Sequence, residues 1–500
     1  MCVSDLNTVV GPYWGGRQVR HAGRYPLSVE RHVVSQVAHL VPGVTAVTPN
    51  ARYFTLHAVI ADEVKRRGLV AAEAQQLMRR AEVVMAAITV AHGPHPGLSA
   101  AHGADRIRPS LNTGVIDVAA LSEPGNYAKS KWGFWGPYRG SETLLRLTHW
   151  ESTNIAAGAD LPMRALREAL EPVIYLARRD QVEVSTLLDN ARCCICGCAG
   201  AADGALLRDR LVSPHADPMS NAGRRTATIK MMLRIFELHE IASATRDMWP
   251  VVAYDKDILD DPVCGPLEAT VAWRGVVLRS RSVRAWRDLW AELVNTIGGL
   301  TTVVGLADTF AASLPDQTVA TYIDGLPDTG SRNALLPAEQ DDGVWDRPVL
   351  DRSLALLFIG GARVGALSDR VAAYFEDPSE AQQELTPSWV AARAGEWQQR
   401  SVRDFARWLT GVLVARSQRI ALRKASFHKT TGTFRVPERV FVRDGLLFRD
   451  SYESGGEVGF RWNPLASVLV GAGLSHFTSD DNSQGEAVYR PTSRAMELLR

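Results

Sequence analysis

The fold class of this chain is indicated by the stretch Ala72-Glu-Ala-Gln-Gln-Leu-Met-Arg-Arg-Ala-Glu-Val-Val-Met-Ala-Ala-Ile-Thr-Val-Ala-His92. Apolar residues recur in it at helical spacing and form one face, at Leu77, Ala81, Val84, Ala87 and Ile88. The pair Gly93-Pro94 that follows is typical of a helix end. We therefore predict a helix over residues 72–92, preceded by another over residues 53–67 that ends at Gly68.

Helical periodicity dominates the rest of the chain. Further helices are predicted over residues 161–178, 224–244, 282–296, 351–375 and 388–425. Short strands are predicted near the N-terminus and over residues 433–442, 445–449 and 487–490, with helices over 464–474 and from 492 onward. The pattern predicts a mainly α, multi-domain protein with a small α+β, winged-helix-like module at its C-terminal end.

A chain of 500 residues is too long for one ordinary hydrophobic core, so several domains are expected. Residues 324–348 hold three prolines, three glycines and several acids, a composition typical of a linker. We predict an N-terminal, mainly helical domain over residues 1–245, which includes an aromatic and basic loop. A middle helical domain follows over residues 246–385 and contains the predicted linker, and a basic α+β module follows over residues 386–500.

Composition and charge limit the classes of function. The chain is 46% hydrophobic and 22% charged, as expected of a globular protein. Its formal net charge of +1 gives no overall attraction to nucleic acid or to a membrane, so any nucleic-acid contact must come from a local patch. We find no signal peptide, no apolar run of ~18 residues and no cysteine pattern of a secreted disulfide framework. The sequence predicts a cytoplasmic protein without membrane contact.

Motifs of the common hydrolases are absent from the sequence. The chain has no Gly-x-x-x-x-Gly-Lys-Ser/Thr phosphate loop, no Gly-x-Ser-x-Gly elbow and no His-Glu-x-x-His zinc helix. These absences argue against an ordinary nucleotide hydrolase, serine hydrolase or metalloprotease. They favour a non-catalytic role and leave the question of an enzyme open.

An aromatic and basic stretch follows the N-terminal helices: Tyr127-Ala-Lys-Ser-Lys-Trp-Gly-Phe-Trp-Gly-Pro-Tyr-Arg-Gly140. It holds five aromatic residues, three cations and three glycines, and is too broken for a continuous helix or strand. Exposed rings beside cations can stack on bases while the cations meet phosphates. The same rings, turned inward, would pin a loop onto the core. The first alternative assigns nucleic-acid binding to Lys129, Lys131, Trp132, Trp135, Tyr138 and Arg139.

A second basic region lies between residues 401 and 450, where eleven cations face four acids and give a local charge of +7. Arg416, Arg419 and Arg423 are three and four residues apart and so share one helix face. Lys424 and Lys429 extend this charge into the following loop. Such a helix can contact a phosphate backbone of DNA. The alternative is a solvated face that acids elsewhere in the chain balance.

Two groups of residues are candidate metal ligands. The first is Cys193-Cys-Ile-Cys-Gly-Cys198, whose thiolates suit zinc, with Cys193, Cys196 and Cys198 as the candidate ligands. Its cysteines are more crowded than the two separated pairs of usual zinc sites, so either further ligands are required or the thiols are buried and reduced. The second group lies in a Gly- and Pro-rich segment, and its imidazoles could bind zinc or iron. The alternative interpretation of this segment is a solvated loop without a metal. The second group consists of His92, His95 and His102.

Three short segments carry a resemblance: Pro42-Gly-Val-Thr-Ala-Val-Thr-Pro-Asn-Ala-Arg-Tyr53, Arg79-Arg-Ala-Glu82 and Arg419-Ile-Ala-Leu-Arg-Lys424. Together they resemble a group of uncharacterised bacterial proteins often found in phage-defence or mobile gene neighbourhoods. The resemblance implies an accessory component of DNA-centred defence rather than a metabolic enzyme. It implies no catalytic residue.

From these observations we expect a non-catalytic, DNA-associating or scaffold component of a bacterial assembly, with antiphage defence as its setting. DNA and the other proteins of the assembly are the expected partners. One alternative is a metal-dependent enzyme of unrecognised type that holds zinc through the Cys193–Cys198 cluster or the three histidines. Another is a protein–protein adaptor whose aromatic stretch anchors an interface.

Overall fold

The computed structural model describes residues 25–332, 334–376, 383–428, 433–478 and 486–500. These residues form 22 α-helices and only small sheets, which confirms the predicted mainly α class. Among them, no helix is long and apolar enough to cross a lipid bilayer. The chain divides into two compact units, each assembled from separate stretches of sequence. Unit 1 contains residues 25–36, 253–256 and 271–458 of the described chain, and unit 2 contains residues 37–252, 257–270 and 459–500.

Unit 2 combines helices with three small antiparallel sheets. Its strands pair as β1 (Val115–Asp117) with β4 (Gln181–Glu183), β2 (Thr148–Glu151) with β3 (Asn154–Ala157), and β12 (Ser475–Thr478) with β13 (Val488–Pro491). Two short 3₁₀ helices are η2 (Ala191–Cys193) and η3 (Ile195–Cys198). Its α-helices are α2 (Ala51–Arg67), α3 (Ala71–His92), α4 (Ala104–Leu111), α5 (Val118–Leu121), α6 (Trp135–Leu144), α7 (Met163–Leu176), α8 (Val184–Asp189), α9 (Ala202–Leu211), α10 (Asn221–Leu238), α12 (Asp257–Asp260), α21 (Trp462–Gly471) and α22 (Ser493–Leu499).

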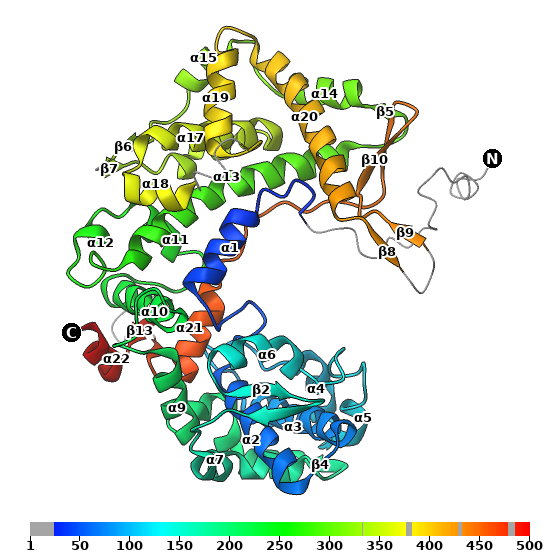
Figure 1. The fold of residues 1–500 in the computed structure, drawn as a ribbon, viewed down its shortest axis with the longest axis vertical. Helices are drawn as coiled ribbons and strands as arrows, with labels where there is room; N and C mark the ends of the chain where they lie inside the picture. The colour runs from blue at the N-terminus through cyan, green and yellow to red at the C-terminus, as the bar shows by residue number, and fades with distance from the viewer. Residues whose placement is uncertain (1–24, 333, 377–382, 429–432, 479–485) are drawn as a thin grey trace. The chain divides into compact units, whose positions relative to one another are not determined.

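Helices α2 and α3 form the core of unit 2, and the other helices and strands of its N-terminal part surround them (Figure 1). Residues 51–61 of α2 and 77–89 of α3 are all buried, as expected of helices that are covered on every side. Both helices match their predictions closely. Helix α2 ends where Gly68 adopts a φ of 62°, a left-handed conformation that glycine accepts without strain, and its N–H bonds to the carbonyl of Lys65.

Unit 1 contains a helical layer and several β-hairpins. Its strands are β5 (Thr301–Thr302), β6 (Gly330–Ser331), β7 (Ala334–Leu335), β8 (Ser426–His428), β9 (Thr433–Arg435), β10 (Val440–Arg443) and β11 (Leu446–Arg449), paired β6–β7, β8–β9 and β10–β11–β5. Three helices contribute residues to both units: α1 (Arg31–Leu40), α11 (Met248–Tyr254) and α13 (Glu268–Thr296). The remaining helices are α14 (Val303–Ala312), α15 (Val319–Asp324), α16 (Asp342–Trp345), α17 (Val349–Ala366), α18 (Asp369–Phe375), α19 (Pro387–Trp397) and α20 (Val402–Arg423).

The core of unit 1 is built on helix α13, which contributes three large buried rings: Trp273, Trp286 and Trp290. Around it, α14 packs on α20 and α17 packs on α19 (Figure 1). The segment 324–348, predicted as a linker, lies within this unit. Its Glu339 forms a buried ion pair with Arg363 of α17, which is fully buried. The segment is therefore part of the fold of unit 1 rather than a solvated linker, because it forms β6, β7 and α16 and its Glu339 is buried.

The two units differ from the three consecutive domains predicted from the sequence. Residues 386–458 belong to unit 1, whereas residues 459–500 return to unit 2, where α21 packs on α2. The predicted C-terminal module is therefore shared between the units, and its winged-helix character is not confirmed. Periodicity reports which face of a helix is buried but not which element buries it, so the sequence did not reveal this return.

A buried network of charges holds the aromatic stretch 127–140 onto the core of unit 2. The imidazole of His57 donates from Nδ1 to Glu142 Oε1 at 2.5 Å and from Nε2 to Glu82 Oε1 at 3.0 Å, and all three side chains are fully buried. The Glu82 carboxylate also accepts the backbone N–H groups of Phe134, at 2.9 Å, and Trp135, at 3.2 Å, at the start of α6. A carboxylate is favourable there because the first N–H groups of a helix lack partners within it.

The loop between these elements leaves no room for a larger residue at position 133. Gly133 has a φ of 56°, and a Cβ atom added to it would lie 2.2 Å from the Glu82 carboxylate.

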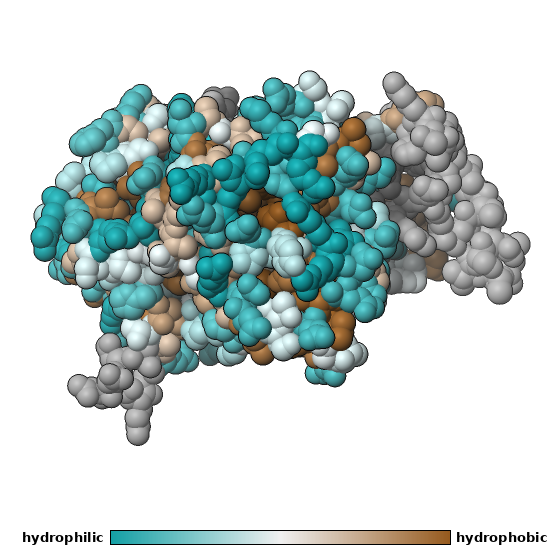
Figure 2. All heavy atoms as spheres, turned by 90° about the horizontal axis from the view of Figure 1, so that it is seen from below, coloured by the Kyte–Doolittle hydropathy of each residue, from teal (hydrophilic) through white to brown (hydrophobic). Residues whose placement is uncertain are grey.

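Hydrophilic residues cover most of the face that Figure 2 shows, and apolar residues form separate patches, as is usual for protein surfaces.

The network makes His57 a residue on which unit 2 depends. We expect His57→Ala to lower the free energy of unfolding by about 3–5 kcal/mol, because it leaves two buried carboxylates without a cation. Urea denaturation measures the loss, and amide hydrogen exchange of peptides that span residues 127–140 locates it. His149→Ala is the matched control, since His149 is exposed on β2 of the same unit. Equal stabilities of the two variants would contradict this role of His57.

Stability should also depend on pH through the same residue. Burial alone would lower the pKa of His57, but the charges and hydrogen bonds of Glu142 and Glu82 outweigh it and raise the pKa to about 9. A raised pKa in the folded state means that the stabilisation is complete below pH ~6.5, the unfolded value, and is lost as pH rises through about 9. We expect urea titrations to report a loss of about 3 kcal/mol across this window in the wild type. His57→Ala should remove that dependence.

Candidate metal centre

Four side chains from two distant segments meet on unit 2. They are His92, His95, Cys194 and Cys196, and their ligand atoms all lie within 4.8 Å of one another. The Cys194 Sγ atom lies 3.0 Å from His95 Nε2, and the Cys196 Sγ atom lies 3.5 Å from His92 Nδ1. Within the described parts of the chain, this is the only group of three or more His, Cys, Asp or Glu residues with that proximity. We call these four residues the His2Cys2 cluster.

The separations in the His2Cys2 cluster match those of a tetrahedral zinc site. Zinc binds imidazole nitrogen and thiolate sulfur at about 2.0–2.3 Å, which places the ligand atoms of a tetrahedron roughly 3.3–3.8 Å apart. The two contacts at 3.0 and 3.5 Å, and the upper limit of 4.8 Å, lie around that range. The donor set therefore fits a zinc ion.

The histidines owe their position to the end of helix α3. His92 is the last residue of α3, and Gly93 turns the chain away with a φ of 115°. His95 then folds back, so that its ring lies 5.2 Å from the ring of His92. Thr89, one turn earlier, connects this end to the cysteine segment, because its hydroxyl accepts the backbone N–H of Ile195 at 3.3 Å. Gly93 and Pro94, which end the helix, thus also place both imidazoles beside the cysteines.

A buried ion pair from α2 fixes the cysteine segment. Arg52 and Asp203 are 1% and 0% exposed and pair at 2.8 Å. The Arg52 guanidinium also donates to the backbone carbonyls of Arg192 and Cys194. Gly197 makes this approach feasible, since an added Cβ would lie 2.3 Å from the Arg192 carbonyl oxygen. Arg52 is therefore a positioning residue for the two cysteines of the cluster.

The pKa values of the two thiols of the cluster shift in opposite directions. The pKa of Cys196 falls to about 5, because the Cys194 thiol donates a hydrogen bond to its thiolate and because His95 and His92 lie beside it. The pKa of Cys194 is raised by the same hydrogen bond and by burial. One thiolate is thus available at neutral pH, and a bound cation would displace the second proton.

Three of the predicted metal ligands lie elsewhere. Cys193 and Cys198 are fully buried, and burial raises the pKa of both thiols, so they are apolar core residues. His102 bonds through Nε2 to the Tyr138 hydroxyl at 3.1 Å and stacks on Phe134 at 4.1 Å. Burial lowers the pKa of His102 to about 3, which keeps its ring neutral. None of these three residues belongs to the His2Cys2 cluster, whereas Cys196, His92 and His95 do.

Sequence reasoning missed Cys194 as a ligand and treated the cysteines and histidines as two separate sites. The cysteine pair of the cluster has the pattern Cys-x-Cys, and its partners have the pattern His-x-x-His, 99 positions away from His95 to Cys194. Each pair offers half of a tetrahedral set. The presence of two such pairs in the sequence could have indicated one shared site. Only the packing of η2 and η3 on α3, however, brings the cysteine pair to the histidine pair.

The residues predicted to bind nucleic acid on the aromatic stretch separate into two groups. Lys129, Lys131 and Arg139 are exposed and Trp132 is half-buried. Trp135 and Tyr138 are 1% and 0% exposed, so neither can stack on a base, and their assignment to a binding surface is wrong. Their rings serve the packing of the loop instead: the Tyr138 hydroxyl accepts the N–H of Asn50 at 3.1 Å.

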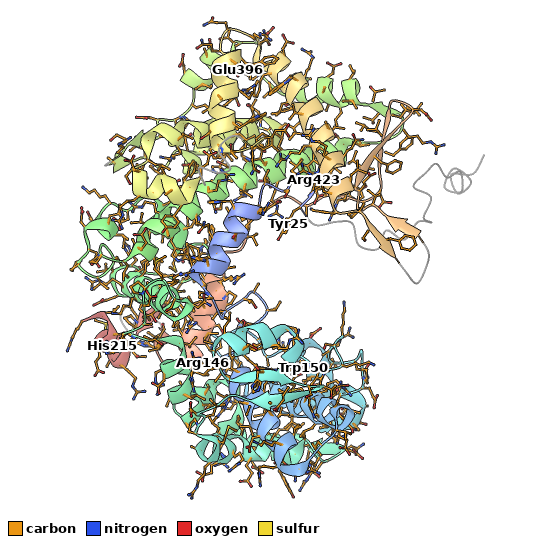
Figure 3. The ribbon with its side chains drawn as sticks, in the orientation of Figure 1. Tyr25, Arg146, Trp150, His215, Glu396 and Arg423 are labelled. Carbon is orange, nitrogen blue, oxygen red and sulfur yellow. The ribbon has the colours of Figure 1, made fainter. Side chains whose placement is uncertain are left out.

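The basic residues of α20 are partly engaged within unit 1. Arg416 and Arg419 both pair with Glu384, and Arg416 also donates to the carbonyl of Leu27 at 2.8 Å. Arg423 is exposed at the end of α20 (Figure 3), and the Lys424 ammonium donates to the carbonyl of Tyr25 at 2.7 Å. Lys429 lies outside the described residues. The predicted phosphate-binding face therefore offers fewer unengaged cations than the sequence indicates, because Arg416, Arg419 and Lys424 already bind groups of unit 1.

Comparison with known proteins adds no name to this geometry. No protein family, no curated protein and no solved structure matches the chain.

Proposed function

We propose that this protein binds one zinc ion through His92, His95, Cys194 and Cys196, and that it acts by binding rather than by catalysis. One observation carries the proposal: four ligand atoms from two segments 99 positions apart lie within 4.8 Å of one another. Arg52 of α2 and Thr89 of α3 support it, because each forms a hydrogen bond that holds the cysteine segment on the core of unit 2.

The chemistry of the donor set favours zinc. Two thiolates and two imidazoles form a soft and intermediate ligand set, which suits zinc, whereas calcium and magnesium prefer oxygen ligands. The cluster contains no carboxylate. The thiol of Cys196, with its low pKa, already supplies one thiolate at neutral pH.

A full set of four protein ligands supports a structural role for the ion. Catalytic zinc sites use three protein ligands and keep the fourth position for water or substrate, while structural sites are closed by four. In this proposal the ion fastens the end of α3 to the turns η2 and η3. A site closed by four protein ligands therefore favours a non-catalytic protein over a metal-dependent enzyme, in agreement with the accessory role that the resemblance of the three short segments implies.

Metal analysis tests the proposal directly. We expect wild-type protein, purified without chelators, to carry about one zinc ion per chain, the stoichiometry of a site with four protein ligands. Cys194→Ser and His95→Ala should each lose most of it, because each removes one ligand of the tetrahedral set. Elemental analysis by mass spectrometry gives the stoichiometry, and circular dichroism shows that the variants are folded.

Cys193→Ser is the matched control, since Cys193 adjoins Cys194 but is buried away from the cluster. It should keep its zinc. Wild-type protein that binds no zinc when offered an excess, or equal losses of zinc in Cys193→Ser and Cys194→Ser, would sink the proposal.

Removal of the metal should destabilise the contact between the end of α3 and the turns η2 and η3. We expect chelation to lower the free energy of unfolding by about 3 kcal/mol, the stabilisation that a ligand gives at roughly 100 times its Kd. Hydrogen exchange should increase in peptides around residues 92–97 and 191–198, and α13 should be unaffected. The Cys194→Ser variant should not respond to the chelator. A similar response of wild type and variant would mean that the chelator acts elsewhere.

A further inference from the structure

We infer that unit 2 also carries a binding surface for single-stranded nucleic acid, formed by the rings of Trp132 and Trp150 and the cations Lys129, Lys131 and Arg139. We call these five residues the tryptophan surface. The inference goes beyond the metal centre and does not rest on it, because the two features share no residue.

Three tryptophan rings pack together at this surface. Trp150 of β2 stacks on Trp135, with ring centroids 5.4 Å apart and an interplanar angle of 18°. Trp132 meets both rings at steep angles, 5.3 Å from Trp150 and 5.0 Å from Trp135. Trp135 is buried, but Trp150 is 41% exposed, and Figure 3 labels it on the strand. The buried ring of Trp135 therefore supports the rings of Trp132 and Trp150, which are both partly accessible to solvent.

The buried network fixes this group of rings. Trp135 donates from Nε1 to the Thr148 hydroxyl at 2.9 Å, and that hydroxyl donates to Glu142 Oε2. Glu142 in turn accepts from the imidazole of His57. A large exposed ring that the core already holds in place loses little conformational freedom when it binds a partner. The aromatic platform is thus organised before any ligand arrives.

The cations of the tryptophan surface are exposed and close to the rings. Lys129, Lys131 and Arg139 are exposed, and none of them forms an ion pair with any residue that the structure describes. The Arg139 guanidinium lies 5.8 Å from the centre of the Trp150 ring. On α20, by contrast, Arg416 and Arg419 share one glutamate. Three exposed cations without a described ion pair therefore lie beside the tryptophan rings.

Charge complementarity selects the partner. Three cations without counter-ions favour an anion, and a polyanion that also offers flat rings is a nucleic acid. The bases of a duplex are stacked on one another, so Trp132 and Trp150 can stack only on the bases of an unpaired strand. Stacking of this kind tolerates any base, because every base has an aromatic face. The surface therefore predicts binding without strong sequence preference.

Fluorescence anisotropy with a labelled random-sequence strand of about 16 nucleotides tests the inference. We expect Trp150→Ala to weaken binding about tenfold through the loss of one stacked base. The double variant Lys129→Gln and Lys131→Gln should reduce the slope of log affinity against log salt by about 1.4, or roughly 0.7 for each phosphate contact to a single strand. Titrations between about 50 and 200 mM salt measure both effects.

Tyr175→Ala is the matched control. Tyr175 is a 55% exposed ring on α7 of the same unit with the Arg179 guanidinium 4.8 Å above it, but it belongs to no group of rings. This variant should bind like the wild type. Duplex of the same length should bind more weakly than the single strand. The inference is overturned if wild-type protein does not bind single strands at low salt, binds duplex equally well, or is weakened equally by the two aromatic variants. Cys194→Ser, if folded, should bind normally, which separates this result from the test for zinc.

Discussion

The imidazolium of His57, held between the buried carboxylates of Glu82 and Glu142, is the interaction on which unit 2 depends. A buried charge is stable only when its partners surround it, so these three residues must stay together for the core to exist. Glu82 lies on α3 and His57 on α2, while Glu142 belongs to α6. The network therefore joins the two central helices to the aromatic stretch, and a loop rich in glycine acquires one defined conformation.

Helix α2 serves both candidate sites through two buried charged side chains five residues apart. His57 reaches the aromatic stretch, and Arg52 reaches the carbonyls of the cysteine segment while Asp203 neutralises it. Each contact lets a polar backbone segment pack against the core with its groups satisfied. The zinc ion proposed here would add a third connection, from the end of α3 to η2 and η3. Both proposed sites thus lie on elements that pack against α2 or α3.

The sequence predicted the helices well, and above all α2 and α3, because apolar periodicity and a Gly or Gly-Pro stop are local signals. It did not predict the shared C-terminal segment, nor that Glu339 would make residues 324–348 part of a core, because both depend on tertiary contacts that local sequence patterns do not report. The site was predicted in halves. Composition pointed to cysteine and histidine, but tertiary packing decides which of them face one another: Cys193, Cys194 and Cys198 are all buried, and Cys194 is the one that contacts His95. In the aromatic stretch, the burial of each ring likewise decides its role: Trp135 and Tyr138 are buried and pack the loop, whereas Trp132 is partly accessible.

The return of residues 459–500 to unit 2 has a consequence for the order of folding during synthesis. Helix α21 lies so close to α2 that a Cβ atom added to Gly471 would be 2.7 Å from Cβ of Ala51. The ribosome makes α2 and both halves of the His2Cys2 cluster early, then the whole described part of unit 1 between residues 271 and 458, and only afterwards α21. Until then the surface of α2 that α21 covers is open to water or to a chaperone. The nascent chain would therefore hold all four residues of the proposed zinc site before α21 packs on α2 and on η3.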